Sequence, residues 1–316
     1  MSDTPKLTLK ELQPFLEGLL AELGYKLNEH YQFVKTDAYG LSIIKSIDDV
    51  AFELYVFKQE NELPGLTKTM IMDYLSWYLN DYPQRKLIEH RQVIKYDPSA
   101  IRRTRTLADA VAGKGHNPLY DVVFDQIGYC IKMRMFGKAP QYPLWLNISG
   151  PDGVGKSKFV ERWMSSIIPA HYIERPQSTA EGSVLNNLEK NGYLFIERYA
   201  IIFGELLGAS DVAIDNIKNL VDVGSINFRG YYGQSSRSGQ NIAQLISTSN
   251  KHLKDKFQRD DAIRKYCDIP FVSSDTQEEL AERWKVINDF DYLEWMRSID
   301  ENGDEPLVKH YKAFLA

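Results

Sequence analysis

The sequence has few cysteines, no long apolar run and no excess of positive charge, and each shortage excludes a class of protein. Cys130 and Cys267 are the only cysteines, too few for a disulfide framework or a zinc cluster. No apolar run reaches the roughly 18 residues of a membrane-spanning helix. The polar start is not that of a secretory signal peptide. We therefore expect a cytoplasmic protein without a membrane partner.

The charge balance excludes a second class, the proteins that coat nucleic acid with a uniformly basic surface. Lys and Arg number 38 and Asp and Glu 43, for a formal net charge of −5. A local basic groove remains compatible with this balance, since net charge says nothing of how charges are distributed. At 316 residues with 43% hydrophobic content, the chain can form one domain of about 200 residues and a smaller one.

One short segment carries most of the chemical information. Residues 150–157 read Gly-Pro-Asp-Gly-Val-Gly-Lys-Ser, which fits the pattern of glycine, four residues, glycine, lysine and serine or threonine. We call this segment the glycine loop. Glycines permit positive φ and bring backbone N–H groups close to an anion. Lys156 can then reach the β- and γ-phosphates of a nucleotide, and the Ser157 hydroxyl can hold Mg²⁺.

The residues around the glycine loop favour the same interpretation over a simple glycine turn. An apolar run, 144–148, precedes the loop and predicts a buried strand, and an apolar stripe from Phe159 to Ile167 predicts a helix that ends before Pro169. The N-terminus of such a helix favours negative charge. The sequence therefore predicts binding of ATP with Mg²⁺. The expected nucleotide contacts are Gly150, Pro151, Asp152, Gly153, Val154, Gly155, Lys156, Ser157 and Lys158.

A second apolar run, 193–197, ends in an acid and predicts a strand beside the loop. A carboxylate at the carboxyl end of such a strand can hold Mg²⁺ or polarise the attacking water. Glu197 is the candidate for both roles, and Glu205, on a predicted helix, could contribute from the next turn. The alternative for each is a solvated surface charge.

A third apolar run, 242–248, predicts another buried strand, and Asn250 follows it. A side-chain amide at this position can hydrogen-bond the γ-phosphate or the attacking water, the alternative being a plain turn residue. Since the tips of neighbouring parallel strands meet at one edge of a sheet, we expect Lys156, Glu197 and Asn250 to converge on one triphosphate.

The segment between the second and third runs predicts a hairpin that touches nucleic acid. Residues 225–237 interleave arginines, aromatics and glycines, so guanidinium groups can meet phosphates and rings can stack on bases. The candidate nucleic-acid contacts are Lys218, on the preceding helix, and Arg229, Tyr231, Tyr232 and Arg237. A solvated hairpin is the alternative.

Arg264, further along the chain, could reach the γ-phosphate of a nucleotide bound to its own subunit or to a neighbouring one. The alternative is a surface ion pair.

Four stretches follow from these patterns: a small α+β domain (1–96), a connector with a helix over 118–136 (97–142), the nucleotide-binding core (143–275) and a helical tail (276–316). The tail is expected to have one or two helices over 276–296. Within the first stretch, an apolar stripe from Leu9 to Leu23 and the segment 67–79 predict helices, whereas 51–57 and 87–96 predict strands. The fold class expected is α/β, with a parallel sheet.

The order of these motifs resembles that of superfamily 3 helicases, nearest to the virulence-associated protein E family and the helicase halves of phage and plasmid primase-helicases. The matching positions, within about 118–275, are Gly150 to Ser157, Glu197, Lys218, Asn227 to Gly233, Thr248 to Asn250, and Arg264 with Lys265. The resemblance implies a P-loop NTPase core of AAA+-like type, ATP hydrolysis and unwinding of single-stranded or forked DNA in replication of a phage, plasmid or genomic island.

The resemblance also implies a ring, commonly hexameric, with ATP at each subunit boundary. Lys156 would hold phosphates, Ser157 and Glu197 the metal, Asn250 would sense the γ-phosphate, and Arg264 would complete the neighbour's site. Three features depart from the family pattern. The acid strand lacks a second acid, and Lys265 stands at the second position of the arginine pair. No primase catalytic acids are evident upstream, where residues 1–96 are too few for a full primase domain.

Two other classes of function remain open on the sequence. The chain could be an ATP-dependent switch or loader that binds DNA or a replication protein, docking through residues 1–96, without unwinding. It could also be a kinase that uses the same loop, although no arginine-rich lid segment accompanies it.

Overall fold

The computed structural model describes residues 9–28, 32–36, 40–61, 66–176, 181–205, 216, 219–221, 224–229, 236–252, 266–273 and 276–315. The chain divides into two compact units, Met1–Ile88 and Glu89–Ala316. The finer four-part division expected from the sequence stays a prediction.

The first unit packs helices on a small antiparallel sheet. Its helices are α1 (Leu9–Glu22), α2 (Ile47–Glu60) and the first part of α3 (Lys68–Val93), and its strands are β1 (Tyr25–Leu27), β2 (Phe33–Thr36) and β3 (Ser42–Lys45), in the order β1-β2-β3. Leu16, Leu54, Ile71 and Tyr74 are fully buried in its core. The predicted helices over 9–23 and 67–79 are confirmed.

Two strand predictions made within residues 1–96 are wrong. The segment 51–57 lies in α2, because Ser46 caps the helix reciprocally with Asp49 and the buried Val50 and Leu54 follow a helical spacing. The segment 87–96 lies mostly in α3, where Leu87 is buried and the adjacent Ile88 is 55% exposed. In both places alternating apolar residues imitate a strand although they lie on different faces of a helix.

The second unit is built on a five-stranded parallel sheet. The strands are β4 (Trp145–Ser149), β5 (Ile173–Glu174), β6 (Ala200–Glu205), β9 (Gln244–Ser249) and β10 (Tyr266–Pro270), in the order β10-β4-β9-β6-β5. Every neighbouring pair is parallel. The strand predictions over 144–148 and 242–248 are confirmed, as is the α/β class. The carboxyl ends of β4, β9 and β6 therefore lie side by side.

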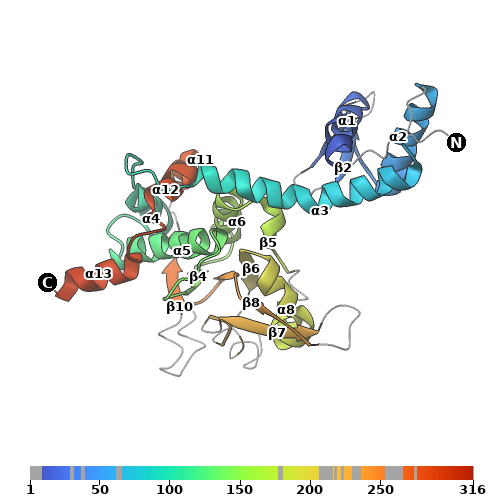
Figure 1. Ribbon diagram of the computed structural model, residues 1–316. Coiled ribbons are helices and arrows are strands. Elements are labelled where there is room, and N and C mark those ends of the chain that lie inside the picture. Colours follow the sequence, from blue (N-terminus) through green and yellow to red (C-terminus); the bar gives the residue numbers. More distant parts are fainter. Residues whose placement is uncertain are drawn as a thin grey trace. The chain divides into compact units, whose positions relative to one another are not determined.

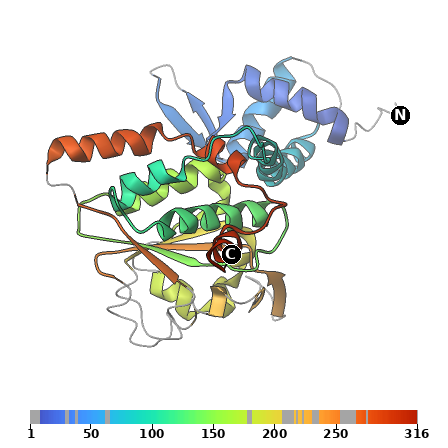
Figure 2. The same cartoon turned by 90° about the vertical axis from the view of Figure 1, so that its left-hand side faces the viewer.

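Helices cover both faces of this sheet (Figures 1 and 2). On one face lie α5 (Leu119–Met135) and α6 (Lys156–Ile167), both predicted, where Phe124, Phe159 and Trp163 form a ring cluster. On the other lie α8 (Leu188–Glu197) and the antiparallel hairpin of β7 (Ser225–Arg229) and β8 (Ser236–Gln240). The remaining short elements are α7 (Glu181–Asn186) and a 3₁₀ turn (Ala170–Tyr172).

The strand predicted over 193–197 is wrong, because this segment is the end of α8. Gly192 and Phe195 are buried at helical spacing against the hairpin and the sheet. The strand that lies beside β9 is instead β6, whose Ala200, Ile201 and Phe203 are fully buried. Two apolar runs, each ending in a glutamate, follow one another here, and the second one enters the sheet.

The C-terminal helices return to the sheet domain. They are α11 (Gln277–Asp289), α12 (Tyr292–Ser298) and α13 (Pro306–Leu315). Of the one or two helices predicted over 276–296, two are present, α11 and α12. A buried carboxylate, Asp125 of α5, accepts hydrogen bonds from Thr104 Oγ1 (2.6 Å) and Trp295 Nε1 (3.0 Å). This contact ties α4 (Thr104–Ala112) and α12 to α5.

Candidate functional site

The glycine loop turns sharply between the end of β4 and the start of α6. Gly150, Gly153 and Gly155 have φ of 151°, 77° and 98°, values that side chains rarely allow. A Cβ at Gly150 would lie 2.6 Å from the carbonyl oxygen of Phe271, and one at Gly155 would lie 2.4 Å from the Trp284 ring. Around Gly153 a Cβ would meet nothing within 4 Å. The loop is thus held closely at both ends and open at its middle.

Lys156, the first residue of α6, is only 7% exposed and its ammonium lies over the loop. Nζ donates hydrogen bonds to the carbonyl oxygens of Gly150 (2.8 Å) and Pro151 (2.7 Å) and to Asn250 Oδ1 (3.0 Å). Because Asn250 directly follows β9, the neighbouring strand, this contact joins two strand ends. The structure brings Lys156 and Asn250 together, as expected.

Ser157 is connected to the end of β6 by Thr248, a residue of β9 that contacts both. Ser157 Oγ and Thr248 Oγ1 are 3.2 Å apart, and Thr248 Oγ1 lies 3.3 Å from the carbonyl oxygen of Gly204. Glu205 pairs with Thr248 in the sheet register, just after a register shift that follows Phe203. The backbone of Glu205 is described and its side chain lies outside the description. Glu205, which the sequence interpretation placed on a helix, therefore ends a strand at this site.

Glu197 does not lie at a strand end. It closes α8, its side chain is 53% exposed, and its Oε2 is 3.6 Å from the adjacent Arg198 guanidinium. The expected convergence of Glu197 with Lys156 and Asn250 is corrected accordingly, since it depended on a strand that is a helix. The acid that ends a strand at this edge is Glu205, and the signal for it was present in the buried run 200–203, which Gly204 and Glu205 follow.

A buried polar network, missed in the sequence, aligns the strands that carry the site. Asn147 Nδ2 donates to Ser249 Oγ (2.8 Å) and Asp268 Oδ1 (3.1 Å), and Ser247 Oγ donates to Asn147 Oδ1 (2.8 Å). His252 Nδ1 lies 3.0 Å from Ser149 Oγ and 3.2 Å from Asp268 Oδ2. These bonds link β4, β9 and β10 just beneath the glycine loop, so they fix the positions of Lys156 and Asn250.

The oxygen groups at this edge fit Mg²⁺. This cation takes oxygen ligands and often only one or two from protein, with phosphates and waters completing the shell. Ser157 Oγ, Thr248 Oγ1 and the end of β6 meet here. Among the described residues no group of three or more His, Cys, Asp or Glu side chains could hold a metal ion alone.

Neither cysteine belongs to a reactive site. Burial raises the pKa of both Cys130 and Cys267 to about 12, so both stay protonated thiols at neutral pH.

None of the helices in the described part of the chain combines the length and the apolar character that a membrane span needs.

The predicted hairpin over 225–237 is confirmed in its strands, and it packs on α8. A Cβ at Gly192 would lie 2.6 Å from Phe228, so the two elements are in close contact. Arg229 is 65% exposed and forms an ion pair with Glu189 of α8, itself 58% exposed. Arg237 pairs with Phe228 through the backbone. The predicted contacts Lys218, Tyr231, Tyr232 and Arg264 lie outside the described residues.

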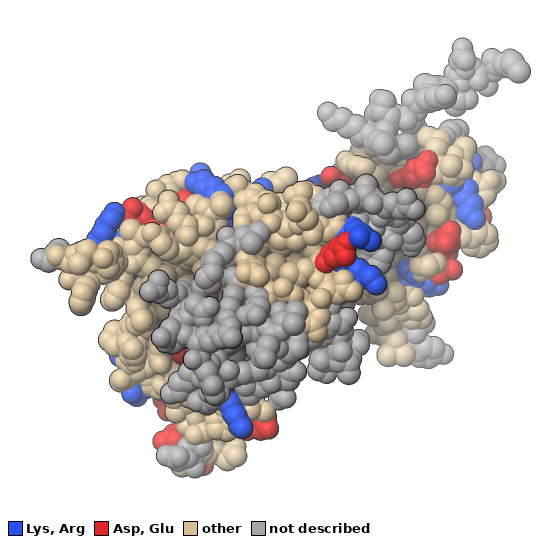
Figure 3. Space-filling model, turned by 90° about the horizontal axis from the view of Figure 1, so that it is seen from below, with Lys and Arg blue, Asp and Glu red and all other residues tan. Residues whose placement is uncertain are grey.

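The described surface charges are of both signs. On the face that Figure 3 shows, described Lys and Arg side chains lie singly or in small groups, several of them beside Asp and Glu side chains. Charges of opposite sign also meet in the ion pair of Arg229 with Glu189, both of them exposed.

Comparisons with known proteins add little to this geometry. No protein-family model matches the chain, and no curated protein matches it. Among solved structures, two of the NrS-1 C-terminal region in its A form without ligand are 12% and 11% identical to it. They cover 66% and 68% of this chain, with a TM-score of 0.43 each. The chain spans about half of each neighbour's length, 48% and 52%. Similarity at this level assigns neither a family nor an activity.

Proposed function

We propose that this chain is an ATP-dependent DNA helicase or translocase of superfamily 3 type, with a P-loop NTPase core in residues 143–275. The observation that carries the proposal is the 3.0 Å contact between Lys156 Nζ and Asn250 Oδ1. It joins a glycine-loop lysine to a polar residue at the end of the adjacent parallel strand, the edge at which ligands of open α/β sheets bind.

In the proposed reaction the backbone N–H groups of the glycine loop and Lys156 bind the phosphates. The lysine ammonium, now held by carbonyl oxygens of Gly150 and Pro151, would exchange these for phosphate oxygens. Asn250 would hydrogen-bond the γ-phosphate or the attacking water. Such preorganised groups stabilise the charge that develops during phosphoryl transfer.

Ser157 and Glu205 would hold Mg²⁺, which when bound neutralises charge on the phosphate oxygens. Glu205 would also orient the water, the role first predicted for Glu197. The register pairing of Glu205 with Thr248, together with the Ser157–Thr248 contact, supports this choice. Arg264 as the residue that completes a neighbour's site, and the hexameric ring, remain part of the proposal on the family resemblance alone.

A second candidate, a switch or loader that binds DNA or a replication partner without unwinding, is favoured by one observation. Arg229 of the hairpin, which the sequence predicts to contact phosphate, forms an ion pair with Glu189. A neutralised arginine is a weaker contact for phosphate than a free one, so coupling of hydrolysis to strand movement would be weaker.

Phosphate release from Mg·ATP, with and without single-stranded DNA, tests the proposal. Wild-type protein is expected to hydrolyse ATP and to be stimulated by DNA, and Lys156→Ala to do neither. Displacement of a strand from a forked duplex then separates the helicase from the switch. Transfer of phosphate to an acceptor other than water would show a kinase, and absence of nucleotide binding by the folded wild type would refute the proposal.

A further inference from the structure

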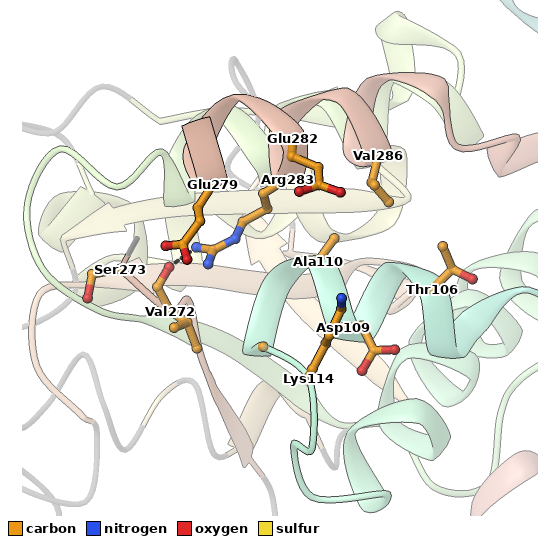
Figure 4. A pocket seen from close by; sticks show the side chains of 11 residues that line it. Thr106, Asp109, Ala110, Lys114, Val272, Ser273, Glu279, Glu282, Arg283 and Val286 are labelled. Atoms are coloured by element: carbon orange, nitrogen blue, oxygen red, sulfur yellow. Dashed lines mark hydrogen bonds between the residues drawn. The ribbon is translucent and has the colours of Figure 1, made fainter. Parts of the chain in front are cut away.

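A cavity of about 570 Å³ lies between α4 and α11 in the second unit (Figure 4). Thr106, Asp109 and Ala110 line it from α4, and Glu279, Glu282 and Val286 project into it from α11. The turn at Gly113 and Lys114 and the segment of Val272 and Ser273 that follows β10 close it. Its volume is within the range of ligand pockets, roughly 300–1,000 Å³.

Two residues that line the cavity are each next in sequence to a residue that packs against the glycine loop. Val272 lines the cavity, and the preceding Phe271 places its carbonyl oxygen against Gly150. Arg283 lines the cavity, and the next residue, Trp284, lies against Gly155. The cavity therefore lies close to the glycine loop.

The walls are also fixed to the sheet and to each other. Val272 N donates to the carbonyl oxygen of Val111 at 3.0 Å, which joins the segment after β10 to α4. The Arg283 guanidinium donates to the carbonyl oxygen of Val272, which joins α11 to that same segment. The Lys158 ammonium lies 5.1 Å from the centre of the Trp284 ring, a cation–π contact between α6 and α11. The cavity is therefore part of the fold and needs no rearrangement to form.

The charges in the cavity suit the uncharged end of a nucleotide better than its phosphates. Three carboxylates, Asp109, Glu279 and Glu282, face two cations, Lys114 and Arg283. Carboxylates repel phosphate but accept hydrogen bonds from sugar hydroxyls and from ring amino groups.

Apolar side chains complete this chemistry. Ala110, Val272 and Val286 supply surfaces against which a planar ring can pack. Asp109 Oδ1 lies 3.2 Å from His116 Nδ1 and 3.4 Å from Arg105 Nε. A few polar groups placed among apolar walls are typical of pockets that bind a heterocycle.

We propose that the α4–α11 cavity binds the nucleoside, base and ribose together, of the triphosphate whose phosphates lie on the glycine loop. This inference rests on the proposed function and adds the site that distinguishes a nucleotide from a bare polyphosphate. Helix α11 then contacts both ends of the ligand, through Val286 and Glu282 in the cavity and through Trp284 at the loop.

Binding of two ligands to variants of α11 tests the inference. Val286→Trp fills the cavity, and Lys285→Trp places the same bulk on the adjacent, exposed position of the helix, outside the cavity lining. Affinities for Mg·ATP and for Mg·tripolyphosphate, which has phosphates and no nucleoside, are measured by calorimetry. Val286→Trp is expected to weaken ATP binding at least about tenfold and to leave tripolyphosphate binding within about twofold. Lys285→Trp is expected to change neither.

The outcomes separate this inference from the function on which it rests. Loss of both ligands in Lys156→Ala with unchanged ATP binding in Val286→Trp would leave the function standing and overturn the cavity assignment. Wild-type protein that binds neither ligand would overturn both. If Val286→Trp lowers the unfolding temperature and weakens the binding of both ligands, Glu282→Gln is the variant that tests the inference. Glu282 is exposed, and the substitution preserves the shape of its side chain. A loss of about threefold or more for ATP alone supports the inference, and equal binding overturns it.

Discussion

The glycine-loop edge of the parallel sheet and the β7–β8 hairpin hold their basic groups in opposite ways. Lys156 is 7% exposed and is fixed by three oxygens from two strand ends. Arg229 is 65% exposed and is held by one exposed carboxylate. A buried cation in a fixed oxygen cage has a geometry that the fold maintains, whereas an exposed ion pair exchanges partners at small cost. Steep effects of mutation are therefore expected at the first region and shallow ones at the second.

The largest effect is expected for Lys156→Ala. Removal of the ammonium leaves the phosphates without their buried cation, and turnover of ATP should fall by about 10³-fold or more. Lys190→Ala, at an exposed position of α8, is the control for loss of a lysine charge away from the loop and should retain most of the activity. Phosphate release at saturating ATP measures both. Equal losses in the two variants would mean that the loop contributes only general positive charge.

Glu205→Gln and Glu197→Gln compare the two candidate acids directly. Glu205 ends β6 beside Thr248, so its loss should lower kcat about 10²–10³-fold with ATP binding retained. Glu197 lies at the exposed end of α8, and its loss should change kcat less than about twofold. The two kcat values, with ATP affinity as the control, check this. The reverse order would restore the assignment made from the sequence.

Asn250→Ala tests the role of the residue that follows β9. Loss of the amide removes one oxygen from Lys156 and the proposed contact to the γ-phosphate or water, so kcat should fall about tenfold to 10²-fold. Binding of ATP should change much less. Lys251→Ala, at the next and exposed position, controls for disturbance of the turn. An unchanged kcat in Asn250→Ala would make this residue a turn residue only.

The smallest effects are expected at the hairpin. Arg229→Ala should weaken binding of single-stranded DNA several-fold at moderate salt and reduce the salt slope by about one. Glu189→Ala should strengthen DNA binding, because it releases Arg229 from its ion pair. Fluorescence anisotropy with a labelled oligonucleotide over a salt series measures both changes. A lower DNA affinity in Arg229→Ala together with a higher one in Glu189→Ala supports a phosphate contact at Arg229. If the DNA affinity is unchanged in both variants, Arg229 is not part of the DNA site.

The parts of the fold predicted well from the sequence are those with strong local signals. The glycine loop requires glycine at fixed positions, and the runs 144–148 and 242–248 are short and continuously apolar, as buried parallel strands are. The stripe of α6 and that of α5 have clear helical spacing. From these the meeting of Lys156 and Asn250 followed, since the glycine loop that leads to Lys156 follows β4, Asn250 follows β9, and these two strands are neighbours.

The errors arose where the same local pattern fits two structures. The segment 193–197 is apolar, short and ends in an acid, as a strand beside the loop would be, yet it ends α8, whose Leu194 and Phe195 pack in one core cluster with Ile226 of the hairpin. The choice between Glu197 and Glu205 depended on that distinction. The polar network of Asn147, Ser249 and Asp268 could not be predicted either, because it joins residues about a hundred positions apart or more. The cavity between α4 and α11 likewise depends on contacts of distant segments.

The most direct test of the central claim is a structure of the protein with Mg²⁺ and a non-hydrolysable ATP analogue. The account predicts that Lys156 Nζ leaves the carbonyl oxygens of Gly150 and Pro151 for the phosphates, with Asn250 at the γ-phosphate or its water and the Glu205 carboxylate at the metal. A triphosphate bound away from the glycine loop, or Glu205 directed away from it, would contradict the account.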